Sequence, residues 1–246
     1  MPDPIVSVKA LVKNYANQAA LKGLTFDVPK GALYGCFGPN GAGKSTLVKI
    51  LTGQLEPTSG TATVLGFAPG KKTLSIKQNV GIVPESESPP SFLTGLEYLE
   101  FVCRLRGIDG DGERINKWLD FFDLTQKKDT LCKDMSKGMR QKIMLAAAFI
   151  HQPPLLFLDE PFINLDPIYQ RRVRDYLKDY VNAGGSIFMC SHILEIAEKV
   201  CTHAIVIDDG SVLAGGPIAS FRHNGADLAD VFLDLIESKG ASRRGA

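Results

Sequence analysis

The sequence lacks an excess of charge of either sign. Its 28 lysines and arginines nearly balance its 27 aspartates and glutamates, which leaves a formal net charge of +1 at pH 7. Without a strong overall field, the chain has no general attraction to nucleic acid or to an acidic membrane surface. We therefore expect no nucleic-acid partner. Binding to any charged partner would need a local patch of opposite charge on this protein.

Paired cysteines are missing as well. The chain has five cysteines, an odd number, and none of them form a CxxC pair. This pattern argues against a secreted disulfide framework and favours reduced thiols in a cytosolic protein. The five are widely spread, at Cys36, Cys103, Cys132, Cys190 and Cys201.

Long hydrophobic runs are absent too. The longest apolar string, IMLAAAFI, is far shorter than the roughly 20 residues that span a bilayer. The first residues, MPDPIVSVKA, contain no basic region followed by an apolar run, so they do not predict a signal peptide. We expect a soluble chain whose 246 residues form one large domain or one domain that carries a subdomain.

What the sequence does have is an alternation of strands and helices. The segment IYQRRVRDYLKDYVNAGG, residues 168–185, places apolar side chains at helical spacing and ends in two glycines, which predicts an amphipathic helix with a stop signal. Strands interleaved with such helices predict an α/β fold with a mainly parallel sheet covered on both faces. Apolar runs predict strands near residues 4–9, 22–28, 33–37, 61–65, 80–83, 155–158, 186–190 and 203–208.

Residues 94–150 differ because their apolar positions follow helical spacing and include no convincing strand. We interpret them as a helical insertion, bounded by the serine- and proline-rich ESESPPS, which predicts a mobile joint. The final SKGASRRGA predicts disorder. The expected single domain, 1–246, comprises a catalytic core of about 1–85 and 151–220, a helical subdomain of about 86–150, and a C-terminal helix and tail of about 221–246.

A phosphate-binding motif stands out near the N-terminus. GPNGAGKST, residues 38–46, fits GxxxxGK followed by Ser or Thr, and it lies between the apolar LYGCF and the helix-forming LVKILTG. Its glycines let backbone N–H groups turn around phosphate oxygens at the positive end of a helix. Lys44 then supplies a cation to the β and γ phosphates, and Ser45 offers a hydroxyl to Mg²⁺. The alternative is an accidental glycine-rich turn, which a chain of this length would match about once in a hundred.

Two further apolar strands end in polar side chains. LLFLDEP delivers Asp159, a candidate Mg²⁺ ligand, and Glu160, a candidate base that polarises the attacking water. The alternative is an ordinary strand that ends in a polar turn. His192 follows the strand SIFMCS at the same predicted sheet edge, where it reaches a γ-phosphate as a donor. His151 and His203 lack such a setting, and we interpret them as structural.

Together these pieces resemble the nucleotide-binding subunit of ATP-binding cassette (ABC) transporters over roughly residues 4–236. The matching pieces, in family order, are Tyr15, GPNGAGKST, VGIVPE, MSKGMRQK, LLFLDEP, NLDP with Asp166, and CSH with His192. The resemblance implies a P-loop NTPase fold with a mainly parallel sheet, an N-terminal antiparallel β subdomain and a helical insertion subdomain. It implies ATP, with Tyr15 stacking on adenine, and Mg²⁺ held by Ser45, Asp159 and Glu85. The nucleotide-binding residues would be Tyr15, Gly38, Asn40, Gly41, Ala42, Gly43, Lys44, Ser45 and Thr46.

In this family two subunits face head to tail, and the signature segment of one closes over the ATP held by the other. DMSKGMRQK would therefore serve the partner's nucleotide, with Ser136 offering a hydroxyl and Gly138 allowing backbone approach at a helix N-terminus. Asp166 would lie at the dimer seam. The implied catalytic residues are Lys44, Ser136, Gly138, Glu160, Asp166 and His192.

The resemblance also implies partners and a place in the cell. SKGMRQK and the C-terminal DLADVFLDL are similar to the branch whose ATPase is a separate chain serving an exporter permease. Such a chain dimerises on ATP, as a homodimer or a paralogous heterodimer, and sits on the cytoplasmic face of the membrane through a transmembrane permease. The alternative is a soluble scaffold or assembly ATPase of the same superfamily. A GTP switch or nucleotide kinase shares the phosphate motif, but the chain has no NKxD base-reading motif.

One departure from the family pattern concerns the metal site. Glu85 stands where glutamine is usual. A carboxylate keeps a metal-ligating oxygen but loses the N–H donors of the amide. We therefore expect tighter dependence on Mg²⁺ and slower hydrolysis.

Other departures lie in the signature and before Asp166. Met135, Lys137 and Met139 stand where Leu, Gly and Gln are commonest, so only the signature serine and glycine are carried over as contacts. Asn164 replaces a frequent glycine, and the sequence alone offers no account of it.

Overall fold

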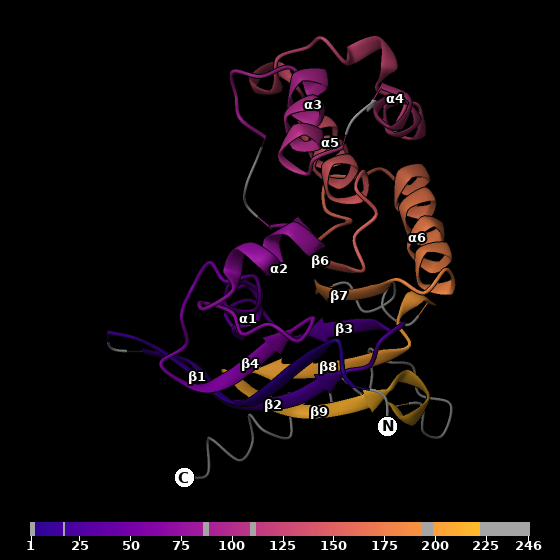
Figure 1. Ribbon diagram of the computed structural model, residues 1–246. Helices are drawn as coiled ribbons and strands as arrows, with labels where there is room; N and C mark the ends of the chain where they lie inside the picture. The colour runs from indigo at the N-terminus through magenta and orange to yellow at the C-terminus, as the bar shows by residue number, and fades with distance from the viewer. Residues whose placement is uncertain (1–2, 17, 86–88, 109–111, 193–198, 222–246) are drawn as a thin grey trace.

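The computed structural model describes residues 3–16, 18–85, 89–108, 112–192 and 199–221. Figure 1 shows the strands gathered in the lower half of the molecule and three helices, α3, α4 and α5, standing above them. The predicted joint ESESPPS lies partly outside the described residues, and the predicted C-terminal helix and tail lie outside them from residue 222 onward.

The larger sheet has the strand order β5–β6–β7–β3–β8–β9. The first five strands in this order are parallel, and β9 pairs antiparallel with β8 at the edge. Every residue of β3, β6 and β7 is buried, as expected for strands covered on both faces. The bounds are β3 Leu33–Phe37, β5 Val80–Val83, β6 Leu155–Asp159, β7 Ser186–Ser191, β8 His203–Asp208 and β9 Ser211–Pro217.

The smaller sheet is antiparallel and comes mostly from the N-terminal residues. Its order is β2–β1–β4, with bounds β1 Val6–Tyr15, β2 Gln18–Val28 and β4 Ser59–Val64. The pairing of β1 with β2 shifts register between Val8 and Leu11, where Ala10 has a φ of 46°. This bulge interrupts the alternation of side chains, so the sequence predicted only the first part of β1.

Three of the described helices, α3, α5 and α6, begin at a residue whose side chain caps them. Thr94 and Glu97 form a capping box at the start of α3, and Asp166 caps α6 just before Pro167. None of the described helices is both long and apolar enough to cross a membrane. The helix bounds are α1 Lys44–Leu51, α2 Thr73–Asn79, α3 Gly95–Leu105, α4 Gly112–Phe121, α5 Lys137–Phe149 and α6 Pro167–Asn182, with 3-10 turns η1 Thr125–Lys127, η2 Cys132–Asp134 and η3 Ile218–Phe221.

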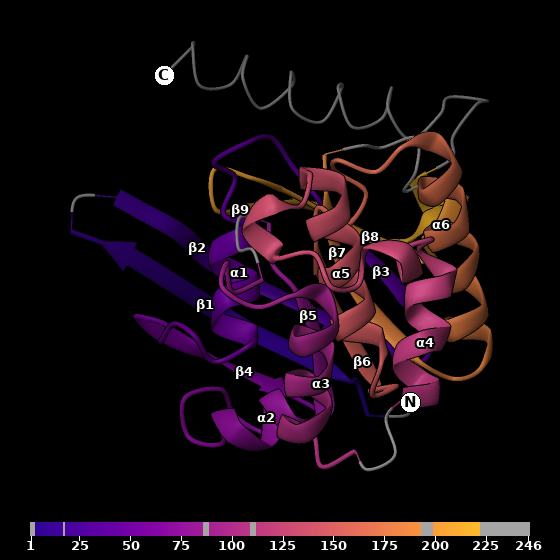
Figure 2. The same cartoon turned by 90° about the horizontal axis from the view of Figure 1, so that it is seen from above.

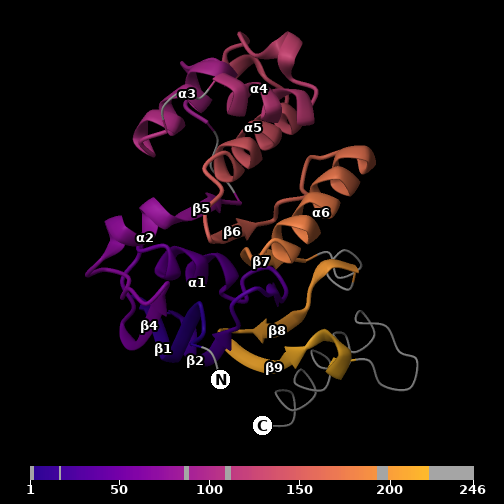
Figure 3. The same ribbon diagram turned by 45° about the vertical axis from the view of Figure 1, so that its right-hand side comes forward.

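Two hydrophobic cores cover the two faces of the larger sheet. One core lies between this sheet and the smaller sheet with α1, and it includes Leu47 and Phe188. The other joins the opposite face to α5, α6 and the helices above, and it includes Phe149 and Leu177. Figures 2 and 3 show the smaller sheet and α6 on opposite sides of the larger one. The α/β fold with a mainly parallel, doubly covered sheet is therefore confirmed.

The helical region, which we define as residues 95–150, packs against α6 through aromatic rings. Trp118 of α4 lies 5.0 Å from Tyr176 of α6 between ring centroids, and Phe149 of α5 lies 4.7 Å from the same tyrosine. The region contains α3, α4 and α5 and no strand among its described residues, as the helical spacing predicted.

Two elements were missed by the sequence analysis. β9 has the sequence SVLAGGP, whose glycines and proline predict a turn, but an antiparallel edge strand tolerates them because one side needs no partner. α2 is short, and only Ile76 in it is buried, so it gives almost no periodic signal. All five cysteines lie in the described part of the chain, where they are buried and form no disulfide.

His151 contacts the first residue of β5, which gives it the structural role that we expected. Its Nε2 lies 3.2 Å from the carbonyl oxygen of Val80, which also accepts from Arg106 at 3.1 Å. Burial, together with the nearby Arg106 guanidinium, lowers the pKa of His151 to about 4. The folded protein therefore holds this ring neutral at a pH where the unfolded chain binds a proton.

We expect His151 to make the fold acid-sensitive. Because its folded pKa is lower than its unfolded pKa of 6.5, the stability that the neutral ring contributes is lost as the pH falls from 6.5 toward 4. His151→Gln keeps a donor for Val80 but cannot be protonated, so it should remove about 2 kcal/mol of the stability loss between pH 7 and pH 4.5. Urea unfolding at the two pH values measures this, and an equal loss in both proteins would contradict it.

Candidate active site

The phosphate motif forms the turn between β3 and α1. Gly41 and Gly43 have φ values of 82° and 108°, which side-chain-bearing residues rarely adopt. A Cβ on Gly38 would lie 2.1 Å from the carbonyl oxygen of Ile207, so this position also excludes a side chain. The loop therefore holds a tight shape that presents backbone N–H groups at the start of α1.

Lys44 lies beneath this loop and is only 7% exposed. Its ammonium donates to the carbonyl oxygens of Gly38 at 2.7 Å and Pro39 at 3.1 Å. An ammonium has three N–H donors, so Lys44 can keep one or both of these bonds while it donates to a phosphate oxygen. The lysine is thus held in place before any phosphate arrives.

Ser45 lies among carboxylates from two other strands. Its hydroxyl donates to Oε2 of Glu85, which follows β5, at 3.1 Å, and Asp159 at the end of β6 lies within reach of the same hydroxyl. Burial raises the pKa of Asp159 to about 6, and the charges of Glu85 and Glu160 add to the rise. Crowded carboxylates of this kind are stabilised by a cation.

These oxygen ligands fit Mg²⁺. Among the described residues, no group of three or more His, Cys, Asp or Glu side chains converges as a complete metal site. This does not conflict with Mg²⁺, which keeps several waters and takes only one or two protein carboxylates together with substrate phosphates. The hydroxyl of Ser45 and the carboxylates of Asp159 and Glu85 supply such a partial set.

Both carboxylate oxygens of Glu160 contact residues at the end of β7. Its Oε1 lies 2.8 Å from Nδ1 of His192, and its Oε2 accepts from the hydroxyl of Ser191 at 3.2 Å. Its backbone N–H donates to the carbonyl oxygen of Cys190 at 2.9 Å, and its φ is 52°, in the left-handed region. The register that pairs Asp159 with Cys190 therefore positions the carboxylate of Glu160 beside His192.

A cavity of about 300 Å³ joins these parts. Tyr15 lies at its edge with 45% of its surface exposed, where a flat ligand can stack on the ring. Gln18 and Ala20 also line it, although the sequence analysis did not predict them. The pairing of β1 with β2 sets Gln18 opposite Tyr15, and the apolar pattern of the sequence does not reveal this pairing. The lining residues are Tyr15, Gln18, Ala20, Asn40, Gly41, Gly43, Lys44, Ser45, Thr46, Glu85, Asp159 and Glu160.

Six predicted site residues do not line this cavity. Gly38 and Ala42 belong to the phosphate loop itself, and His192 contacts Glu160. The other three, Ser136, Gly138 and Asp166, belong to other segments. Ser136 caps α5 and accepts from the N–H of Met139 at 3.2 Å. Asp166 caps α6 and accepts from Ile168 at 3.0 Å and Tyr169 at 3.2 Å. Gly138, the third, lies next to the chain that leads to Asp166.

The backbones of Gly138 and Asn164 are in close contact, and this contact accounts for the residue type at both positions. A Cβ on Gly138 would lie 2.7 Å from the carbonyl oxygen of Asn164, so glycine is needed there for packing within the subunit. Asn164 has a φ of 61°, a left-handed conformation that glycine adopts freely and asparagine tolerates better than most residues. This is the account of Asn164 that the sequence could not give. Lys137 is exposed beside them, and Met139 packs against the core.

The raised pKa of Asp159 predicts a stability effect. A carboxyl whose folded pKa is above its unfolded value of 3.8 destabilises the fold as the pH rises through the window from 3.8 to about 6. Asp159→Asn removes this charge and still offers an oxygen to Ser45. In nucleotide-free protein with EDTA at pH 7, its free energy of unfolding should rise by about 1–2 kcal/mol. A fall in a urea titration would contradict the assigned environment.

Comparisons with known proteins agree with this geometry. A family model described as ABC transporter matches residues 21–163. The daunorubicin/doxorubicin resistance ATP-binding protein DrrA of Streptomyces peucetius is 33% identical over 246 residues, which cover 99% of this chain and 74% of that protein. Nod factor export ATP-binding protein I of Cupriavidus metallidurans is 32% identical over 237 residues, covering 95% and 78%.

A solved structure of an ATP-binding subunit of an ABC transporter gives the same result. It superposes with a TM-score of 0.89 at 30% sequence identity, and the match covers 94% of this chain and 99% of that chain. The chain belongs to the ABC transporter family, as one of its ATP-binding cassette ATPases.

Proposed function

We propose that this chain is the ATP-hydrolysing subunit of an exporter, that it works as a dimer, and that it drives a separate transmembrane permease. The observation that carries the proposal is the placement of Ser136 and Gly138 outside the chain's own nucleotide cavity. They form a second helix start suited to phosphate, and a second subunit's ATP is the phosphate that accounts for it. The dimer is a homodimer or a heterodimer with a paralogous chain.

ATP binds in the cavity beneath Tyr15. The tyrosine stacks on adenine, and the backbone N–H groups between Gly41 and Thr46 surround the phosphates. Lys44 donates to the β and γ phosphates. Ser45, Asp159 and Glu85 would hold Mg²⁺, which neutralises charge on the phosphate oxygens when bound.

Glu160 acts on the attacking water. Its carboxylate accepts a proton from the water while the γ-phosphate bond breaks. Ser191 and His192 fix the two carboxylate oxygens, and 53% of the His192 side chain is exposed. Its second ring nitrogen can therefore face the γ-phosphate, and the doubly protonated ring donates there while Nδ1 donates to Glu160. Burial of Glu160, 5% exposed, excludes competing solvent from this position.

The signature residues complete the site across the dimer. Ser136 can accept from the N–H of Met139 and still donate its hydroxyl proton to a phosphate oxygen of the partner's ATP. Asp166 lies close by, at the seam between the two sites. ATP then holds the two subunits together, and its hydrolysis releases them, which supplies the motion that the permease uses.

The permease would dock beside the predicted joint ESESPPS. Large apolar side chains are exposed there on or next to α2 and α3, namely Leu74, Phe92, Phe101 and Leu105. The bonds from Arg106 to the backbone of Lys77 and Val80 hold the ends of α2 and α3 together, so these side chains lie on neighbouring elements. Such a surface suits a membrane protein segment, and docking there would put the subunit at the cytoplasmic face of the membrane. The name of the Nod factor export relative supports the export direction.

Glu160→Gln tests the dimer. The amide cannot accept the water's proton, so hydrolysis should fall at least about 100-fold while ATP binding persists. The variant should accumulate as an ATP-bound dimer in analytical ultracentrifugation. Ser136→Arg in the same background adds a bulky charge at the seam and should return the protein to a monomer. A monomer in the Glu160→Gln protein at saturating ATP would overturn the dimer mechanism.

Leu105→Glu tests the permease. A charge in the exposed apolar surface should reduce recovery of a polytopic protein in pull-downs from solubilised membranes by about 10-fold, without changing the basal ATPase rate. Val212→Glu is the matched control, because Val212 is an exposed apolar residue on β9. Recovery of no polytopic protein with the unmodified chain would favour the soluble scaffold instead.

A further inference from the structure

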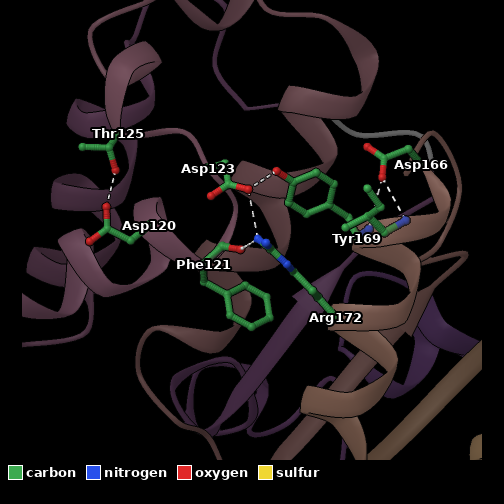
Figure 4. Close-up of polar contacts among 8 residues, drawn as sticks. Asp120, Phe121, Asp123, Thr125, Asp166, Tyr169 and Arg172 are labelled. Carbon is green, nitrogen blue, oxygen red and sulfur yellow. Dashed lines mark hydrogen bonds and ion pairs between the residues drawn. The ribbon is translucent and has the colours of Figure 1, made fainter.

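A polar cluster joins the helical region to α6, and the nucleotide chemistry does not use it. Asp123, just after α4, accepts with one oxygen, Oδ2, from the hydroxyl of Tyr169 at 2.5 Å and from Nη1 of Arg172 at 3.0 Å. Arg172 also donates to the carbonyl oxygen of Phe121 at 3.1 Å. Figure 4 shows these side chains of α6 reaching across to the end of α4.

The ring of Tyr169 also contacts the signature helix. The ammonium of Lys142, on α5, lies 3.0 Å from the centroid of this ring, and the guanidinium of Arg172 lies 5.2 Å from it. A cation over a tyrosine face is attracted to the ring. One side chain of α6 is therefore tied to both α4 and α5, and α5 is the helix that Ser136 caps.

The start of α5 contacts the segment that precedes α6, close to the proposed dimer residues Ser136 and Asp166. Gln141 donates to the carbonyl oxygen of Pro161 at 3.1 Å, and Gly138 packs directly on the backbone of Asn164. Asp166 accepts from the N–H of Tyr169, the same residue whose hydroxyl reaches the helical region. Ser136 and Asp166 thus belong to one surface that is already assembled within a single subunit.

We propose that Asp123, Tyr169, Arg172 and Lys142 form a latch that positions the signature segment for the second subunit's ATP. The proposal rests on the dimer of the proposed function and names the residues that prepare it. The latch residues touch no nucleotide, so they are positioning residues that act through Ser136. When the latch bonds are formed, a larger fraction of subunits already has the arrangement that binds the partner. Dimerisation is therefore stronger.

We expect the latch to affect the orientation of the helical region much more than the free energy of unfolding. The side chains of Arg172 and Asp123 are 44% and 60% exposed, and ion pairs so open to water contribute little to unfolding. The latch bonds fix the end of α4 and the ring beside Lys142 relative to α6, so losing them lowers the fraction of molecules whose signature segment is placed to bind a partner. The apparent dissociation constant of the dimer rises in proportion to that loss.

The experiment uses the full chain with Glu160→Gln and saturating ATP. Asp123→Asn, Arg172→Gln and the double variant are compared by analytical ultracentrifugation. Each single change should weaken the dimer by about 10-fold, and the double change should weaken it by no more than about the larger single effect, because both break one interaction. ATP affinity of the monomer and the urea midpoint should remain unchanged.

Arg171→Gln is the matched control. Arg171 is also on α6 and pairs with Asp175 at 3.8 Å, but this pair joins neighbouring turns of one helix and does not reach the helical region. The control should dimerise like its parent. Tyr169→Phe removes only the hydroxyl and keeps the ring over which Lys142 lies, so it tests the latch if larger changes impair folding, and it should weaken the dimer by at least about threefold.

The outcomes are distinct. If the Glu160→Gln parent dimerises and the latch variants dimerise equally well, the latch is overturned and the proposed function stands. Additive effects of the two single changes, or equal weakening by Arg171→Gln, overturn it as well. If the parent itself stays a monomer, the proposed function fails and the latch fails with it.

Discussion

The parallel register of β3, β6 and β7 is the constraint on which the active site depends. Adjacent parallel strands end at the same sheet edge, so the phosphate loop, the carboxylates and the histidine arrive together although they are far apart in the chain. The pairings of Cys36 with Cys190 and of Asp159 with Cys190 fix the three strand ends relative to one another. A shift of one residue would turn Glu160 away from His192.

This convergence has an electrostatic cost that the ligand relieves. Asp159, Glu160 and Glu85 bring carboxylates close together in a partly buried site, and Lys44 is the cation nearest the phosphate loop. Burial raises the pKa of Asp159, and the charges of Glu85 and Glu160 add to the rise. Before ATP binds, hydrogen bonds from Ser45, Ser191 and His192 hold the carboxylates. The site is thus arranged for a charge that the protein alone does not supply.

The signature segment faces the opposite requirement, because it must present a phosphate-binding helix start to another molecule. Its position relative to the catalytic sheet depends on packing between α5 and the chain before Asp166. The close approach of Gly138 to Asn164 fixes the start of α5 against the segment before α6. The bonds of Asp123 with Tyr169 and Arg172 fix the end of α4 against α6. The aromatic contacts of Trp118 and Phe149 with Tyr176 pack the helical region against α6.

The sequence by itself determined the phosphate loop, the buried strands and the two helix starts, because each depends on residues that are neighbours in the chain. Glycines set the turn of the loop, apolar runs mark the strands, and Ser136 and Asp166 cap their own helices. Only the tertiary structure decided that Gln18 lines the cavity, that Asn164 needs a left-handed backbone, and that Asp123 meets Arg172, 49 residues away. Contacts between distant segments depend on how the elements pack in space, and local propensity carries no record of that packing.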